Sequence, residues 1–129
     1  MRITNDPARS SGGRSDHAAS QTAAAERLES FATHADLCRV LTDPKRLMIL
    51  HALGQGDRTV TELASELHCS MPNASQHLTV LRSAGLVTGQ RDGTTVRYHL
   101  TEPDILTACD IVAAIATRLH SRPATRRTA

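Results

Sequence analysis

Residues 59–87 form the stretch that most constrains the fold of this chain, "TVTELASELHCSMPNASQHLTVLRSAGLV". Thr61 is placed to cap a short helix, and Ser70 is placed to cap a second helix that ends near Gly85. Only residues 68–70 separate these two segments, which leaves room for no more than a tight connection. The stretch therefore predicts a helix, a short turn and a second helix.

The second of these helices has one apolar side and one polar side. Ala74, Leu78 and Leu81 recur at steps of four and three residues, so we expect them to point inward. The opposite side carries uncharged amides and hydroxyls near its beginning, among them Asn73 and Gln76. Because Asn and Gln can pair bidentately with adenine, this side is suited to reading base edges in DNA.

A β-hairpin is predicted to follow the second helix. From Leu86 the sequence favours strand, residues 91–93 are expected to form the turn, and apolar and polar residues then alternate up to Leu100. Arg91 at the predicted tip and Arg97 on the return strand can meet phosphate or enter a minor groove.

Two flanking helices are predicted to be more apolar than one small domain can cover. Helical periodicity begins near Ala24, a further helix starts at Asp43-Pro44, and Thr101 is expected to open the last helix, with Asp104 in a capping-box position. The apolar stripe of the first helix consists of Leu28, Phe31, Ala35 and Cys38. The stripe of the last helix consists of Ile105, Cys109, Val112, Ala116 and Leu119.

The length of 129 residues allows one compact domain with tails. Residues 1–23 are rich in Ser, Ala, Gly and Arg without an apolar stripe, and they predict a disordered N-terminal arm. Residues 122–129 predict a disordered C-terminal tail, which leaves a domain at residues 24–121. The net charge of +2 comes from the termini, so DNA contacts of the domain must come from a local basic patch.

Composition and missing motifs exclude several classes of function. No apolar stretch is long enough for a membrane helix and no export signal is visible, so we expect a cytoplasmic protein without a membrane partner. Aromatic residues make up only 2%, which argues against single-strand binding by base stacking. The sequence has no Gly-rich phosphate loop and no nucleophile elbow, so we expect neither an enzyme nor a cofactor.

Three blocks together resemble the ArsR/SmtB family of small bacterial winged-helix repressors: "LTDPKRLMILHAL", "TELASELHCSMPNASQHLTVLRSAGLV" and "RDGTTVRYHL". The resemblance covers about residues 28–120. It implies a mostly α (α+β) fold, a winged helix-turn-helix with a two-stranded β-hairpin wing. It also implies a homodimer built from the first and last helices, which would account for their excess apolar surface.

The same resemblance places the second helix of the helix-turn-helix in the major groove and the hairpin beside it as the wing. The predicted DNA-binding residues are Ser70, Asn73, Ser75, Gln76, His77, Thr79, Arg82, Arg91, Thr94 and Arg97.

The predicted function is a homodimeric transcriptional repressor on a double-stranded operator with an inverted repeat. It would be released by a thiol-reactive or metal signal. The alternative is a winged-helix protein-interaction module without sequence-specific DNA binding.

The metal sites of the resembled family lack their ligands in this sequence. The positions of the Cys-x-Cys pair hold Thr59 and Thr61. In one register of the zinc site on the last helix, the four positions hold Glu102, Asp104, Ile115 and Arg118. In the other register they hold Asp104, Leu106, Thr117 and His120. We therefore predict no metal site of either kind.

Thiols are the remaining candidates for a sensor. Cys38 and Cys109 lie on the two helices assigned to the dimer interface, where a disulfide would shift the paired helices. Two other interpretations stay open: both are buried core residues, or His34 joins them in a metal site. Cys69, in the turn between the two helices, is expected to be structural.

Overall fold

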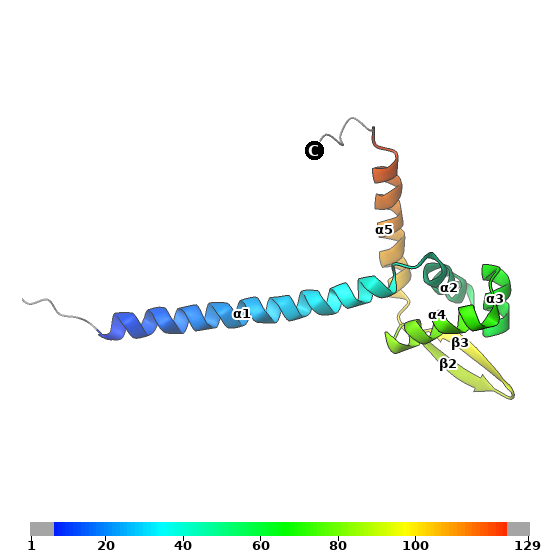
Figure 1. The fold of residues 1–129 in the computed structure, drawn as a ribbon, viewed down its shortest axis with the longest axis horizontal. Coiled ribbons are helices and arrows are strands. Elements are labelled where there is room, and N and C mark those ends of the chain that lie inside the picture. Colours follow the sequence, from blue (N-terminus) through cyan, green and yellow to red (C-terminus); the bar gives the residue numbers. More distant parts are fainter. Residues whose placement is uncertain (1–6, 124–129) are drawn as a thin grey trace, which may run out of the picture. The chain divides into compact units, whose positions relative to one another are not determined.

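The computed structural model describes residues 7–123. Its elements are α1 (Pro7–Val40), α2 (Pro44–Gln55), β1 (Arg58–Thr59), α3 (Val60–Leu67), α4 (Met71–Ser83), β2 (Val87–Asp92), β3 (Thr95–Leu100) and α5 (Asp104–His120) (Figure 1). Most of α1 forms one compact unit that ends at Arg39, and the chain from Val40 onward forms a second one. The predicted order of helices and hairpin is confirmed in this second unit.

The helix α1 begins at Pro7, whereas the sequence predicted a disordered arm up to residue 23. The prediction relied on the missing apolar stripe, but such a stripe reports burial and not the intrinsic preference for helix. Residues 18–25 include five alanines, the residue with the highest helix propensity, so the backbone can be helical without a core. Residues 1–6 of the predicted arm and 124–129 of the predicted tail lie outside the described residues.

The core of the second unit holds the helix-turn-helix together. The side chains of α4 that are predicted to point inward, Ala74, Leu78 and Leu81, are buried. Leu63, Ala64 and Leu67 of α3 are buried as well. They meet Ile49 and Leu50 of α2, which are fully buried as well. Because the apolar side of α4 is enclosed in this way, its opposite side faces away from the core.

The sheet has three strands, one more than predicted. Its order is β1-β3-β2 with antiparallel neighbours, and the short β1 pairs Arg58 with Tyr98. The hairpin register pairs Asp92 with Thr95, so the turn consists of Gly93 and Thr94. The prediction of a turn at 91–93 was wrong, because Gly93 alone adopts the positive φ of 64° that the turn needs and Arg91 stays inside β2.

Two of the predicted helix starts are confirmed. Asp43 caps α2 by accepting a hydrogen bond from the backbone N–H of Lys45 at 2.8 Å, with Pro44 in the first helical turn. Ser70 caps α4 by accepting from the backbone N–H of Asn73 at 3.2 Å. These caps fix where both helices begin.

The other two helix starts differ from the prediction. The cap of α3 is Thr59, not Thr61, because Glu62 lies three residues after Thr59 and completes a capping box with it. The helix α5 begins at Asp104 after Pro103 without a side-chain cap. The hydroxyl of Thr101 instead donates to the backbone oxygen of Gly85.

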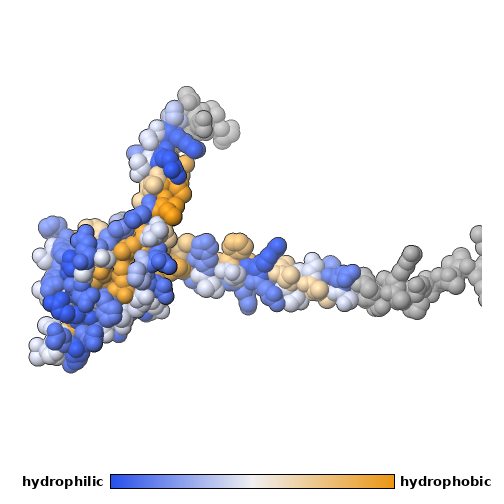
Figure 2. Space-filling model, turned by 180° about the vertical axis from the view of Figure 1, so that it is seen from behind, coloured by the Kyte–Doolittle hydropathy of each residue, from blue (hydrophilic) through white to orange (hydrophobic). Residues whose placement is uncertain are grey.

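The helix α5 is covered by its own unit only along its first turns. Ile105 and Cys109 are buried, and Leu106 lies against Gly54 of α2, where its side chain leaves no room for a Cβ. Farther along the helix, Val112 and Leu119 on the same stripe are 64% and 55% exposed. Figure 2 shows this hydrophobic surface along α5. None of the helices between residues 7 and 123 is long and apolar enough to cross a membrane.

The capping box of α3 gives a direct test of the fold. Replacing Thr59 by Ala should lower the free energy of unfolding by about 1 kcal/mol, since the backbone N–H of Glu62 loses its acceptor. Thr61→Ala is the matched control and should change it by less than about 0.5 kcal/mol, because Thr61 is exposed. Urea unfolding at one protein concentration measures both, and equal effects of the two substitutions would contradict the assignment.

Candidate nucleic-acid interface

The side of α4 that faces away from the core presents polar, uncharged groups. Ser75, Gln76 and Thr79 are exposed, and the amide of Gln76 has no hydrogen-bond partner among the residues the structure describes. The hydroxyl of Thr79 donates to the backbone oxygen of Ser75 at 2.9 Å, which leaves its lone pairs as acceptors. The face therefore offers both donors and acceptors at the spacing of one helical turn.

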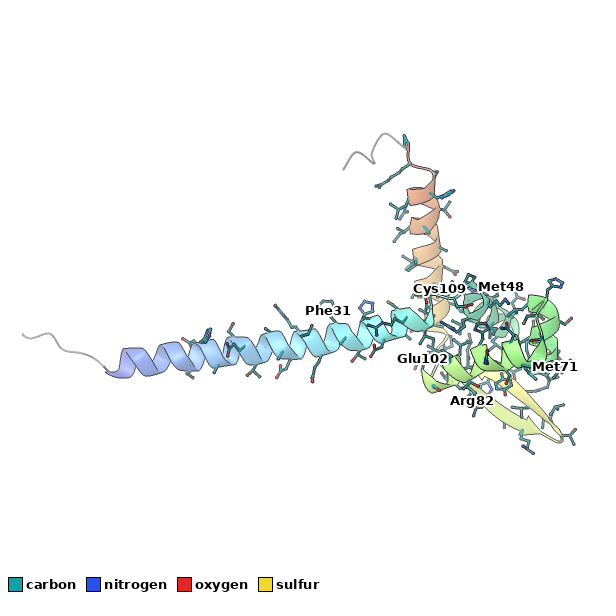
Figure 3. All side chains as sticks on the ribbon, in the orientation of Figure 1. Phe31, Met48, Met71, Arg82, Glu102 and Cys109 are labelled. Carbon is teal, nitrogen blue, oxygen red and sulfur yellow. The ribbon has the colours of Figure 1, made fainter. Side chains whose placement is uncertain are left out.

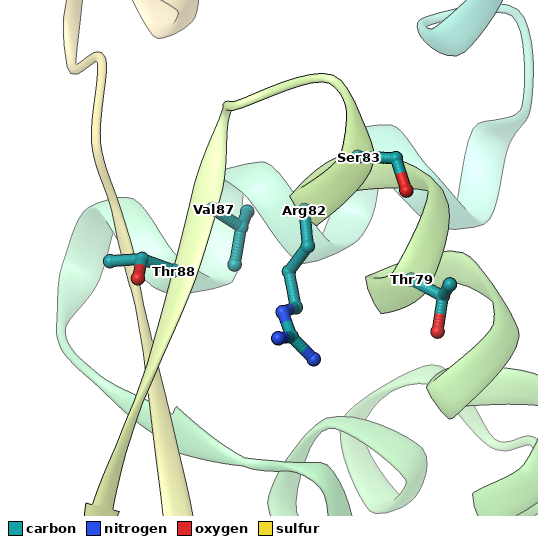
Figure 4. Close-up of a pocket in the computed structure, with 5 residues that line it drawn as sticks. All are labelled: Thr79, Arg82, Ser83, Val87 and Thr88. Atoms are coloured by element: carbon teal, nitrogen blue, oxygen red, sulfur yellow. The ribbon is translucent and has the colours of Figure 1, made fainter.

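Arg82 continues this face toward the sheet. With Thr79, Ser83, Val87 and Thr88 it lines an open groove of about 430 Å³ between the end of α4 and the start of β2 (Figure 4). In Figure 4 the guanidinium of Arg82 extends into the groove. Figure 3 labels Arg82 and Met71 near the two ends of α4, with the hairpin beside the helix. An exposed guanidinium at this place is suited to a phosphate oxygen.

The hairpin supplies further polar groups. Arg91 and Thr94 are exposed, the first inside β2 and the second in the turn. Arg97 is half-buried, and its guanidinium lies 3.9 Å from the carboxylate of Glu62 on α3. A second open hollow of about 260 Å³ is lined by Asp57, Gln90, Arg91, Asp92 and Arg97. Among the described residues Arg91 forms no ion pair with a carboxylate, although Asp57 and Asp92 line the same hollow.

Asn73 and His77 lie on the flank of α4 that faces α2, not on its outward side. The ammonium of Lys45 donates to Oδ1 of Asn73 at 3.2 Å. Nη1 of Arg46 lies 3.5 Å from Nδ1 of His77, and Asp43 Oδ1 lies 3.9 Å from Nε2 of the same ring. With only 13% of its side chain exposed, His77 is not brought to the predicted base-reading face.

Asp43 is the carboxylate at the centre of this flank. Its partial burial disfavours the charged form, but the backbone N–H groups of Lys45 and Arg46 and the charges of His77 and Arg46 outweigh that effect. The pKa of Asp43 therefore lies below its usual value, and the carboxylate is ionised at neutral pH. A fixed negative charge at this point balances the cations at the beginning of α2.

Sequence reasoning missed the part that Lys45 and Arg46 play at this flank. Neither residue carries a local sequence signal for contact with α4. The contacts join residues 28 and 31 positions apart in the sequence, which no periodicity reveals. His51 on α2 is exposed, and its Nε2 lies 3.4 Å from the carboxylate of Asp110 on α5.

The two predicted sensor thiols are in different environments. Cys38 is exposed on α1, whereas Cys109 is buried on α5. Burial, and to a lesser extent the neighbouring charge of Asp110, raises the pKa of the Cys109 thiol. Within the described part of the chain, no group of three or more His, Cys, Asp or Glu side chains is arranged to hold a metal ion.

A helix-turn-helix followed by a hairpin defines the class of winged helix-turn-helix proteins. Residues 43–88 match the family model of bacterial regulatory proteins of the arsR family. The HTH-type transcriptional regulator Rv0081 of Mycobacterium tuberculosis is 36% identical over 88 residues, 67% of this chain and 77% of the relative. The chain belongs to the ArsR/SmtB family, as its motifs indicated.

Further similarities are to a repressor and to solved structures. The HTH-type transcriptional repressor SmtB of M. tuberculosis is 43% identical over 67 residues, 52% of this chain and 50% of SmtB. The crystal structure of Rv0081 has a TM-score of 0.64 at 35% identity, covering 70% of this chain and 92% of that one. The homodimeric winged helix-turn-helix domain of Mb0332 from Mycobacterium bovis has a TM-score of 0.63 at 30% identity, covering 70% and 84%.

Proposed function

We propose that this protein is a sequence-specific transcriptional repressor that inserts α4 into the major groove of duplex DNA. The observation that carries the proposal is the outward face of α4, where exposed Ser75, Gln76 and Thr79 adjoin exposed Arg82. Uncharged hydrogen-bonding groups discriminate between base edges, and an arginine at the end of the helix supplies a cation for a phosphate oxygen. The similarity to the repressor SmtB supports the same function.

The hairpin acts as the wing in this proposal. Arg91 and Thr94 are exposed at its end and reach backbone phosphates or the neighbouring minor groove. Arg97 is drawn toward Glu62 and contributes positive potential more than a direct contact. His77 supports α4 from inside, since its ring lies between Arg46 and Asp43.

The alternative function, a protein-interaction module, requires a different set of side chains on the outward face of α4. A protein partner would be expected to cover large apolar or aromatic side chains at the centre of the patch. On α4 the large exposed hydrophobic residues are Met71 at its first position and Val80 on its flank, and the centre between them is polar. This arrangement favours DNA.

The proposal predicts separable effects for two substitutions on α4. Gln76→Ala should cost about 1–3 kcal/mol of binding to the preferred duplex and relax the preference at one base pair. Arg82→Gln is the matched variant, and it should weaken binding to all sequences and reduce the salt slope by about 1. Anisotropy titrations at several salt concentrations, on duplexes selected from a random pool, measure both. Unchanged sequence preference in Gln76→Ala would contradict the assignment.

We further propose that the repressor is a homodimer that uses the exposed apolar side chains of α5 and α1. On α5 they include Ile111, Val112 and Leu119, and on α1 they include Leu28 and Phe31, all more than half exposed in the single chain. Exposed apolar side chains along a helix are characteristic of the interfaces of obligate dimers. The homodimeric domain of Mb0332 supports the proposal. Two identical subunits would read an inverted repeat.

The dimer can be tested with one charge on α5. Val112→Glu should raise the dimer dissociation constant by roughly 100-fold, because an unpaired carboxylate would be buried in the interface. Thr117→Glu, an exposed position on the side of α5 away from these apolar residues, is the control and should leave the dimer intact. Sedimentation velocity over a range of concentrations distinguishes the variants. A monomeric wild type, or a dimeric Val112→Glu, would contradict the proposed interface.

The signal that releases the repressor is proposed to be a thiol-reactive oxidant or sulfur species that attacks Cys38 first. Thiolate is the reactive form of cysteine, and the exposed Cys38 is reached by solvent whereas the raised pKa of Cys109 keeps that thiol protonated. Peroxide takes two electrons from a thiolate to give sulfenic acid, which a second thiol converts to a disulfide with release of water. Cys109 is the proposed second thiol.

Treatment with peroxide should weaken DNA binding of the wild type by about tenfold, a typical coupling between two sites. Cys38→Ser and Cys109→Ser should not respond, and Cys69→Ser should respond as the wild type does. Gel-shift titration before and after treatment, with reversal by a reducing thiol, measures the effect. An equal response in the wild type and in Cys38→Ser would exclude this signal.

A further inference from the structure

Lys45 is the residue of α2 that touches the predicted base-reading residues of α4 most directly. Its ammonium lies 3.2 Å from Oδ1 of Asn73, across 28 positions of sequence. The backbone on both sides of this contact is held: the N–H of Lys45 binds the cap Asp43, and the N–H of Asn73 binds the cap Ser70. One turn later on α4, His77 faces Arg46 in the same manner. The two helices are therefore joined by two consecutive polar contacts.

The contact with Lys45 decides what Asn73 can offer to DNA. An ammonium has donors only, so the oxygen of the Asn73 amide must face Lys45 and the NH₂ group must point away from it. Nδ2 of Asn73 has no hydrogen-bond partner among residues 7–123. Asn73 therefore presents free N–H donors beside a positive charge.

This state differs from the one that an asparagine needs in order to read adenine. Bidentate pairing with adenine uses the amide oxygen to accept from N6 and the amide N–H to donate to N7. A lone pair remains on Oδ1, but the N6 donor that approached it would also approach the ammonium of Lys45. Guanine presents two acceptors in the major groove, O6 and N7, and both gain from N–H donors and a nearby cation.

We propose that Lys45 is a specificity-determining residue that makes Asn73 a donor to hydrogen-bond acceptors of DNA, with the guanine edge as its target. A phosphate oxygen has the same acceptor chemistry and is the other source that the experiment must distinguish. The inference rests on the proposed function, since it assumes that α4 reads duplex DNA. Lys45 acts through Asn73, so it is a positioning residue whose effect is a change in base preference.

The test begins with selection of duplexes from a randomised pool by the full-length wild type. Duplexes carrying each base pair at every position of the selected site are then titrated with the wild type and with Asn73→Ala. The pair at which Asn73→Ala removes discrimination is the pair read by Asn73. Lys45→Met, Lys45→Arg and Asn73→Asp are measured at that pair. Arg91→Met serves as a control for loss of one positive charge elsewhere.

We expect the wild type to prefer guanine at that pair and Lys45→Met to reduce its preference over adenine by roughly tenfold, since the freed amide oxygen can accept from adenine N6. Lys45→Arg keeps the donors, so it should keep the preference for guanine over adenine. Arg91→Met should lower the affinity for DNA without changing that preference. Asn73→Asp, which removes the donors without altering Lys45, should abolish the preference for guanine. Circular dichroism melting checks that each variant is folded. If a Lys45 variant does not fold, Asn73→Asp still tests the inference.

A phosphate target gives a different pattern that also supports the donor role. Asn73→Ala and Lys45→Met would then weaken binding to all sequences, and Lys45→Met would have no further effect on the Asn73→Ala background. A wild-type preference for adenine at the Asn73 pair, or fully additive effects of the two substitutions, would overturn the inference while leaving the proposed function intact. A wild type that selects no sequence would overturn both.

Discussion

The burial of one side of α4 is the constraint on which the rest of this structure depends. Ala74, Leu78 and Leu81 are enclosed by α2 and α3, and a helix with one side fixed in a core has no freedom to turn about its own axis. The residues opposite that side are then held outward. The proposed reading of DNA needs this rigidity, because base contacts discriminate only when their donors and acceptors are already in place.

Polar contacts refine the orientation that the core establishes. The beginning of α2 meets the flank of α4 through Lys45 and Arg46, while the carboxylate of Asp43 caps α2 and balances the charges there. These contacts also divide the predicted contact residues of α4 into two groups. Ser75, Gln76, Thr79 and Arg82 are exposed, whereas Asn73 and His77 already have partners inside the protein. The contacts with Lys45 and Arg46 therefore limit which hydrogen-bonding groups the second group can offer to DNA.

Local sequence signals predicted the features that depend on neighbouring residues. The caps at Asp43 and Ser70, the buried stripe of α4 and the hairpin after it are all confirmed, since each depends on residues a few positions apart. The cap of α3 was misplaced by two residues, although the spacing of Thr59 and Glu62 carried the signal. The strand β1 and the contacts of Lys45 were not predictable in this way, because they arise from tertiary packing between distant segments. The helical start of α1 was missed because amphipathicity was taken as the requirement for a helix.

The central claim, that the outward face of α4 lies in the major groove, is tested most directly by methylation interference on a duplex that the protein selects. Methyl groups at guanine N7 project into the major groove, and those at adenine N3 project into the minor groove. Our account predicts that N7 methylation blocks binding in two clusters about one helical turn apart, as expected for two recognition helices of a dimer. Binding that tolerates N7 methylation throughout the site would contradict it.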